Sequence, residues 1–170
     1  TPNFPNLEID YIRNLEAVFS LRLMPKTRSD RNDYLSFWNA DNMNYDWFDE
    51  IGFTQGKLAT DNFEFLAEFP QIHNGKGINF VSEIASLSHS NIDKNCIEIN
   101  DKLRFEKDLS NTFDSQAIKI FKDKLFIGYA KRGHNLFFQK AKPENIEMVI
   151  KNIEKNGKLN QIYFSIKVIL

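Results

Sequence analysis

The second half of the chain is dense with short segments in which apolar and polar residues alternate. The clearest case runs from Ile118 to Tyr129, where "IKIF" and "LFIGY" are joined only by Lys122, Asp123 and Lys124. A period of two indicates a strand with one buried face, and so short a connection favours a β-hairpin. Similar segments occur at 62–69, 78–88, 102–108 and 162–170. Short strands at this density predict a small barrel or sandwich.

The first 60 residues carry helical periodicity instead. A first apolar stripe has three- and four-residue spacing and is ended by Pro25; its members are Ile9, Ile12, Leu15, Phe19 and Leu23. A second helix should begin after an N-cap at Ser29 or Asp30, and a third should end near Gly52. We therefore expect a short helical segment over residues 1–70, packed on a β-barrel over residues 71–170.

The segment 143–157 fits two structures. Pro143 at a first helical position, with apolar residues at helical spacing up to Gly157, favours a helix. Ile146, Met148 and Ile150 also alternate, as they would in a strand. Periodicity alone favours the helix.

Composition indicates a folded, soluble chain. Of 170 residues, 42% are hydrophobic and 26% charged, well away from the composition of disordered proteins. No segment resembles a signal peptide, and no apolar run approaches the roughly 20 residues of a membrane helix. With one cysteine an internal disulfide framework is excluded. We expect a cytoplasmic protein with no membrane contact.

Motifs for catalysis or for a cofactor are missing. "GFTQGKL", from Gly52 to Leu58, has its glycines one residue too close for a phosphate-binding loop, and Leu58 replaces the hydroxyl that holds magnesium. Cys96 precedes alternating Ile97 and Ile99, so we expect a small core residue rather than a nucleophile. The three histidines have no zinc-site spacing. We expect no catalytic residue, no metal and no cofactor.

Charge is polarised along the chain. Residues 1–100 hold 8 basic against 15 acidic side chains, and residues 101–170 hold 14 against 8. Between Ser115 and Lys142 Asp123 is the one acidic residue, against the bases Lys119, Lys122, Lys124, Lys131, Arg132, Lys140 and Lys142. Clustered bases favour an anionic partner because binding releases counterions from phosphates. A solvated lysine-rich face is the alternative.

Polar turn-formers surround an aromatic residue just before these bases. Ser110, Asn111, Asp114 and Ser115 can hydrogen-bond their own backbone, and Phe113 lies among them. An exposed ring beside cations is typical of single-strand nucleic-acid sites, where a base stacks on the ring. Asn111 and Asp114 are more often turn residues than ligand residues, and Phe113 and Tyr129 could be core.

These residues resemble the HIRAN family, a module found at the front of certain chromatin-remodelling-type helicases and as bacterial proteins of about this size. The resemblance is carried by "NTFDSQAI", from Asn111 to Ile118, and by "IGYAKR", from Ile127 to Arg132. It extends over about residues 78–170 and, through "LRLMPKTRSDRNDYLSF" and "GKLATDNFEF", into the helical part. It implies an α+β fold, a small OB-like β-barrel with a short helix near 133–141, and makes 145–153 a strand.

The resemblance also implies binding of single-stranded DNA, or another nucleic acid, at a 3′ end. Asn111 and Asp114 would meet the terminal hydroxyl, Phe113 would stack on the last base, and Tyr129 would flank it. Lys131 or Arg132 would hold phosphates. Phe113 stands where the family has tyrosine, Tyr129 where the end-binding helicases have histidine, and "SLSH", Ser86 to His89, where they have a basic–aromatic pair. His89 is expected to substitute in part.

Two other functions remain open. In a protein-interaction or regulatory subunit, the helical half would dock a protein partner through aromatic residues, with Trp38, Trp47, Phe48 and Phe53 as candidates. The same residues could pack the helices. A small-molecule enzyme or a nuclease is the third candidate, without a motif that favours it.

Overall fold

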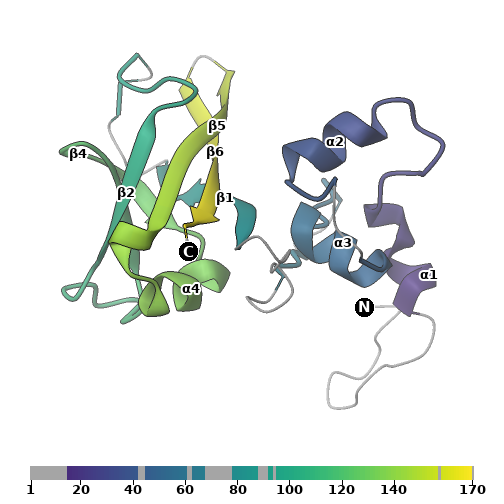
Figure 1. Cartoon of the computed structure of the whole chain (residues 1–170), viewed down its shortest axis with the longest axis horizontal. Helices are drawn as coiled ribbons and strands as arrows, with labels where there is room; N and C mark the ends of the chain where they lie inside the picture. The colour runs from purple at the N-terminus through teal and green to yellow at the C-terminus, as the bar shows by residue number, and fades with distance from the viewer. Residues whose placement is uncertain are drawn as a thin grey trace. The chain divides into compact units, whose positions relative to one another are not determined.

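The structure is a computed structural model that describes residues 15–41, 45–60, 63–67, 78–87, 92–93, 95–156 and 158–169. The chain divides into two compact units, Thr1–Gln71 (unit 1) and Ile72–Leu170 (unit 2). Unit 1 contains the described helices α1 to α3, and unit 2 contains the strands and α4 (Figure 1).

Unit 1 is built from short helices. They are α1 (Leu15–Phe19), continued by the 3₁₀ turn Ser20–Arg22, α2 (Arg31–Phe37) and α3 (Trp47–Thr54). Asp30 is the N-cap of α2, without a side-chain bond. Asp46 caps α3, because its carboxylate accepts hydrogen bonds from Phe48 N at 2.8 Å and Asp49 N at 2.9 Å. Capping at this end compensates for the low intrinsic stability of so short a helix.

The strand predicted at 62–69 is wrong over its described residues, 63–67. This segment lies along α3 instead, since Phe65 N donates to Gln55 O and Ala67 N to Gly52 O, both at 3.1 Å. The rings of Phe63 and Phe65 point the same way because both pack around the guanidinium of Arg22, together with Phe19 of α1. The Arg22 Cζ lies 5.5 to 5.8 Å from the three ring centroids.

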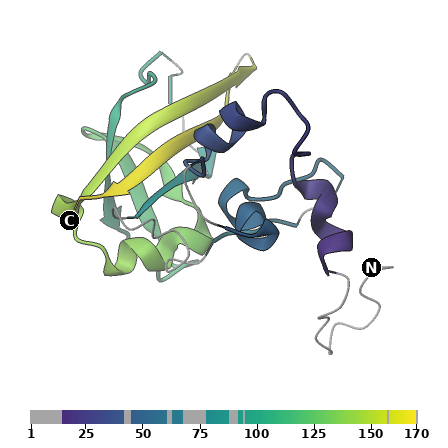
Figure 2. The ribbon, with the colours of Figure 1, turned by 45° about the vertical axis from the view of Figure 1, so that its right-hand side comes forward.

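Unit 2 is a closed antiparallel barrel with the strand order β1-β4-β3-β2-β5-β6 (Figures 1 and 2). The strands are β1 (Asn79–Ala85), β2 (Lys102–Lys107), β3 (Ile118–Lys122), β4 (Leu125–Ala130), β5 (Ile146–Asn156) and β6 (Lys158–Val168). The small α+β barrel and the hairpin expected between Ile118 and Tyr129 are confirmed.

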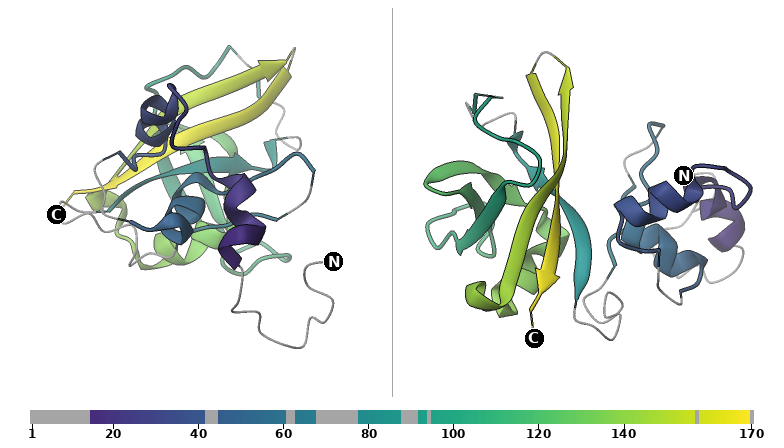
Figure 3. Two further views of the ribbon diagram at one scale, coloured as in Figure 1. Left: turned by 90° about the vertical axis from the view of Figure 1, so that its right-hand side faces the viewer. Right: turned by 45° about the horizontal axis from the view of Figure 1, so that its top comes forward.

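The strand expected at 145–153 is confirmed as part of β5, which follows a 3₁₀ turn at Pro143–Asn145. β5 pairs with β6 from Ile146↔Val168 to Asn156↔Lys158, and the two form a long twisted hairpin (Figure 3). The apolar residues that suggested a helix therefore alternate across a sheet, with Met148 and Ile150 buried.

A short helix, α4 (Asn135–Lys140), follows a 3₁₀ turn at Arg132–His134, as expected near 133–141. It lies across one end of the barrel (Figure 1). Its Phe137 ring packs on Phe80 of β1 at 5.1 Å and its Phe138 ring on Phe105 of β2 at 4.9 Å, centroid to centroid. The interior beneath it is filled by fully buried side chains, among them Ile118, Ile120, Ile127, Ile150, Ile162, Phe164 and Ile166. The helix therefore closes a packed core.

The expectation that Cys96 is a core residue is wrong, because its side chain is exposed. The segment is a turn rather than a strand, and it buries Ile97 while exposing Ile99. The backbone carbonyl of Cys96 accepts a hydrogen bond from Lys122 Nζ at 2.9 Å. Among the described helices of both units, none is long and apolar enough to cross a membrane.

Candidate nucleic-acid interface

The loop between β2 and β3, residues 108–117, is ordered by its own polar side chains. Asp108 Oδ1 accepts from Ser110 N at 3.2 Å, and Asn111 Oδ1 accepts from Phe113 N at 2.9 Å and Asp114 N at 3.0 Å. Asp114 Oδ1 accepts from Gln116 N at 2.9 Å. Three side chains at intervals of three residues, those of Asp108, Asn111 and Asp114, thus hold the backbone of this loop in one conformation.

Asp108 joins this loop to two neighbouring strands. Its carboxylate accepts from Ser110 Oγ at 2.8 Å and from the Tyr129 hydroxyl of β4 at 3.0 Å, and pairs with Lys119 Nζ of β3 at 3.0 Å. The hydrogen bond from Ser110, followed by that from Lys119, holds the pKa of Asp108 far below its usual range. Burial and then the Asp108 carboxylate raise the pKa of Tyr129. The phenol therefore stays protonated and donates to Asp108.

Asp114 is held from a second side by the 3₁₀ turn and α4. Its Oδ2 accepts from Asn135 Nδ2 at 3.0 Å and lies 3.8 Å from Arg132 Nε. The Asn135 amide is buried, and its Oδ1 has no hydrogen-bond partner among the described residues. Because each carboxylate oxygen can accept more than one hydrogen bond, Asp114 keeps acceptor capacity for a donor from outside.

Phe113 projects from the ordered loop into solvent, with 96% of its surface exposed. The neighbouring Leu109 is 92% exposed, and the Arg132 side chain 85%. The alternative that Phe113 belongs to the core is therefore wrong. A ring held by its backbone alone offers a free face for stacking.

The structure brings most of the predicted site residues together. Asn111 and Asp114 share the loop with Phe113, the Tyr129 hydroxyl interacts with the Asn111 side chain, and Arg132 lies beside Asp114. His89 lies outside the described residues.

Lys131 is placed differently from its neighbour Arg132. Its side chain is buried and pairs with Glu83 of β1, which also accepts a hydrogen bond from Gln161 of β6. Lys131 directly follows β4 and Arg132 begins the 3₁₀ turn, so the two side chains leave the backbone in different directions, one into the protein and one into solvent. Lys131 anchors β4 to β1, and of these two bases Arg132 is the one available to a ligand.

The bases between Ser115 and Lys142, which we call the basic strip, are partly neutralised by acidic side chains. Lys119 pairs with Asp108 at 3.0 Å and Lys122 with Asp101 at 2.6 Å. Both acids lie before the strip in the sequence, so a count over residues 115–142 alone overstates its charge. Lys124, Lys140 and Lys142 are exposed.

Sequence reasoning missed Asp108 and Asn135. The turn after β2 explains why an aspartate occurs at position 108, but its partners lie 11 and 21 residues further on and are fixed by the strand register. Asn135 offered no signal, because an asparagine before "LFF" is an ordinary helix-start residue.

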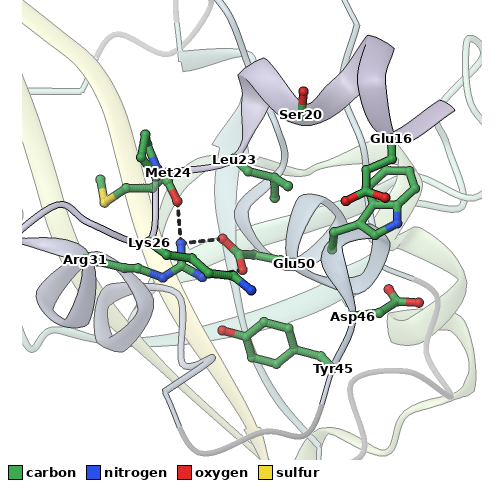
Figure 4. A pocket seen from close by; sticks show the side chains of 11 residues that line it. Glu16, Ser20, Leu23, Met24, Lys26, Arg31, Tyr45, Asp46 and Glu50 are labelled. Carbon is green, nitrogen blue, oxygen red and sulfur yellow. Dashed lines mark hydrogen bonds and ion pairs between the residues drawn. The ribbon is translucent and has the colours of Figure 1, made fainter. Parts of the chain in front are cut away.

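Unit 1 contains a cavity of about 590 Å³ (Figure 4). Arg31 and Glu50 lie on its wall and form a two-pronged ion pair, with N–O distances of 3.0 and 2.6 Å. Tyr45 also lines it, and burial raises the pKa of this phenol. The described residues of either unit include no cluster of three or more side chains suited to a metal ion.

Comparison with known proteins gives only distant likenesses. No protein-family model matches the sequence, and no curated protein matches it significantly. The crystal structure of the HIRAN domain of human HLTF is similar over 54% of this chain and 76% of its own, with 15% identity and a TM-score of 0.41. A structural-genomics protein from Lactobacillus plantarum is similar over 51% of this chain and 91% of its own, with 12% identity and a TM-score of 0.38. The chain is thus similar to a HIRAN domain over about half its length.

Proposed function

We propose that unit 2 binds single-stranded nucleic acid at the loop 108–117 and has no catalytic activity of its own. The observation that carries this proposal is Phe113, almost fully exposed on a loop whose conformation is fixed without its side chain. A base would stack on the ring, and the exposed Arg132 would contact a phosphate. Because the loop is already ordered, binding would cost little conformational entropy.

The proposal extends to recognition of a 3′ end. A free hydroxyl can donate to Asp114, whereas a phosphate at the same place would be repelled by the carboxylate. Asp114 is held on both oxygens, by Gln116 N and Asn135 Nδ2, so it cannot easily turn away from a repelled ligand. The carboxylate would thus favour ends over interior positions of a strand.

The first test is binding of a fluorescent oligonucleotide at low salt, followed by anisotropy. Phe113→Ala should weaken binding by about 1 to 3 kcal/mol, because one base loses its stacking partner. Leu109→Ala is the matched control, since it removes an equally exposed apolar side chain of the same loop that has no ring. Equal losses in both variants, or no binding by the wild type, would refute the site.

The second test compares strands that end in a 3′-hydroxyl or a 3′-phosphate. The wild type should prefer the hydroxyl, and Asp114→Asn should remove the preference while it retains binding. An unchanged preference in the variant would show that another group selects the end.

A protein partner for unit 1 is the second candidate, and exposed apolar side chains favour it. Leu21 is 81% exposed and Phe48 49%. A co-purifying protein that is lost with Leu21→Ser but kept with Arg132→Glu would support this function, and the reverse pattern would oppose it.

A further inference from the structure

The buried amide of Asn135 is directed at the proposed site rather than at its own helix. Asn135 is the first residue of α4 and is only 2% exposed. Its side chain does not cap α4, since its one hydrogen bond among the described residues runs from Nδ2 to Asp114 Oδ2, at 3.0 Å. The other end of the amide, Oδ1, is buried and has no partner in the part of the chain that the structure describes.

Such an amide is a poor choice for stability alone. A buried polar group costs free energy for each hydrogen bond that it leaves unmade, and an apolar side chain of the same shape avoids that cost. Leucine branches at the same carbon as asparagine, is a better helix former and has no oxygen to bury. Residues that break a local rule in this way tend to occur at functional sites. Asn135 is therefore better explained by its effect on Asp114.

The loop 108–117 is attached to α4 without the help of Asn135. Gln139, one turn further along α4, donates from Nε2 to Gln116 O at 3.3 Å. The backbone oxygen of Gln139 accepts from Lys107 Nζ at 2.9 Å, just before the loop begins. The turns of the loop are formed by its own side chains. Removal of the Asn135 amide should therefore leave the loop in place and change only the restraint on the Asp114 carboxylate.

The hydrogen bond from Asn135 fixes the plane of that carboxylate. Gln116 N, which donates to Oδ1 of Asp114 at 2.9 Å, would by itself leave the group free to turn about a single contact. With Asn135 Nδ2 on Oδ2, both oxygens are held and their remaining lone pairs have fixed directions. Arg132 is a weaker restraint, because its Nε lies 3.8 Å away and its side chain is 85% exposed. A fixed direction matters because hydrogen bonds weaken steeply as they bend.

We propose that Asn135 is a positioning residue that determines how strongly the site distinguishes a 3′-hydroxyl from a 3′-phosphate. This inference rests on the proposed function, in which Asp114 meets the end of a single strand. It adds that the distinction depends on a buried residue, 21 positions further along the chain, that acts through Asp114. The overall affinity, which would come from stacking on Phe113 and from Arg132, should depend on Asn135 much less.

The test compares Asn135→Leu with Gln139→Met. Each change replaces an amide on the same side of α4 by an apolar group of similar size, and only the first removes a contact of Asp114. The probe is a 5′-labelled oligothymidylate of about 12 nucleotides that ends in a 3′-hydroxyl or a 3′-phosphate, followed by anisotropy at low salt. The wild type should bind the hydroxyl form at least about ten-fold more tightly. Asn135→Leu should reduce this ratio by about five-fold or more, and Gln139→Met should keep it.

A double-mutant cycle separates positioning from a general structural role. In an Asp114→Asn background the preference for the hydroxyl is already removed, so Asn135→Leu should not change the ratio further. A further change of the ratio in that background would show that Asn135 does not act through Asp114, and would overturn the inference. Should Asn135→Leu unfold, as judged by its melting curve, Asn135→Ala takes its place in both measurements, because it adds no bulk.

The outcomes separate the two proposals. If Asn135→Leu keeps the ratio of the wild type, or if Gln139→Met lowers the ratio equally, the inference is overturned while the Phe113 site stands. If the wild type binds neither strand, or binds both equally well, the proposed recognition of an end has itself failed and the inference falls with it.

Discussion

His134 should make the barrel lose stability as the pH falls from 7 to about 4.5. Its ring is buried in the 3₁₀ turn before α4, with Nδ1 2.8 Å from Ser82 Oγ of β1 and the Phe80 ring 5.0 Å away, centroid to centroid. Burial, and then the nearby charge of Lys131, lowers the pKa of His134 to about 4, against an opposing effect of Glu83. The folded protein thus holds a neutral imidazole.

The size of this loss of stability follows from the difference between the pKa of His134 in the folded protein and in the unfolded chain. In the unfolded chain a histidine titrates near 6.5, so between about pH 6.5 and 4 the unfolded state binds more protons than the folded state. The stabilisation that comes from the neutral His134 is complete above the pKa of histidine in the unfolded chain, and it is lost as the pH falls toward the pKa of His134 in the folded protein. Linkage across this gap gives a loss of about 2 kcal/mol between pH 7 and 4.5, a large share of the stability of a small domain.

The comparison uses His134→Asn, whose amide can replace Nδ1 as the partner of Ser82 but does not titrate. Urea unfolding at several pH values, followed by far-UV circular dichroism, reports the strands of unit 2 together with the helices of both units. Fluorescence of Trp38 and Trp47 reports unit 1 separately. The wild type should lose about 2 kcal/mol more than the variant over this range, whatever their difference at pH 7. Parallel pH profiles for the two proteins would refute a buried, neutral His134.

Two further substitutions test the barrel and the charge of the site. Gly128→Ala should destabilise unit 2 by about 2 to 3 kcal/mol in urea unfolding. The reason is that the new Cβ would lie 2.7 Å from the backbone oxygen of Ala85 on a paired strand. Unchanged stability would show that β4 can shift to make room. Asp108→Asn should release Lys119 from its ion pair and steepen the salt dependence of oligonucleotide binding by about 0.7 in log–log slope. Asp123→Asn removes the same charge from an exposed turn with φ of 52°, which asparagine tolerates, so an equal change there would rule out a specific role for Lys119.

The sequence was informative where one local pattern decides the structure. The hairpin between Ile118 and Tyr129 follows from alternation and a short turn, and both features are visible in a dozen residues. The segment 145–153 is different, because the spacing of its apolar residues favours a helix, and only the resemblance to the HIRAN family made it a strand. Long-range pairing with β6 decides for the strand, and no local pattern contains that pairing.

Two predictions failed for the same physical reason. Phe63 and Phe65 alternate as in a strand, but their neighbours are the end of α3 and the Arg22 guanidinium rather than another strand. Cys96 precedes two isoleucines that alternate, yet only Ile97 finds a place in the core. A short period-two pattern says that one face is apolar, and does not say what covers it.

The position of the candidate site in the sequence could be predicted, but the set of bases that remain available to a ligand could not. Turn-formers around Phe113 indicated an ordered loop, and the structure shows that loop with the ring outside it. Which bases remain available to a ligand depends on ion pairs with distant acids, such as Lys131 with Glu83, 48 residues apart. Those pairings are set by strand order and cannot be counted along the chain.

The independence of the Phe113 side chain from its loop has a consequence for how such a protein can change. Since the hydrogen bonds that shape this loop use the backbone N–H of residue 113 and not its ring, position 113 can be exchanged for residues other than proline with little effect on folding. Natural variation or a saturation library at this one codon would therefore sample new ligand preferences on an unaltered scaffold, and selection could act on recognition and on stability as two separate traits.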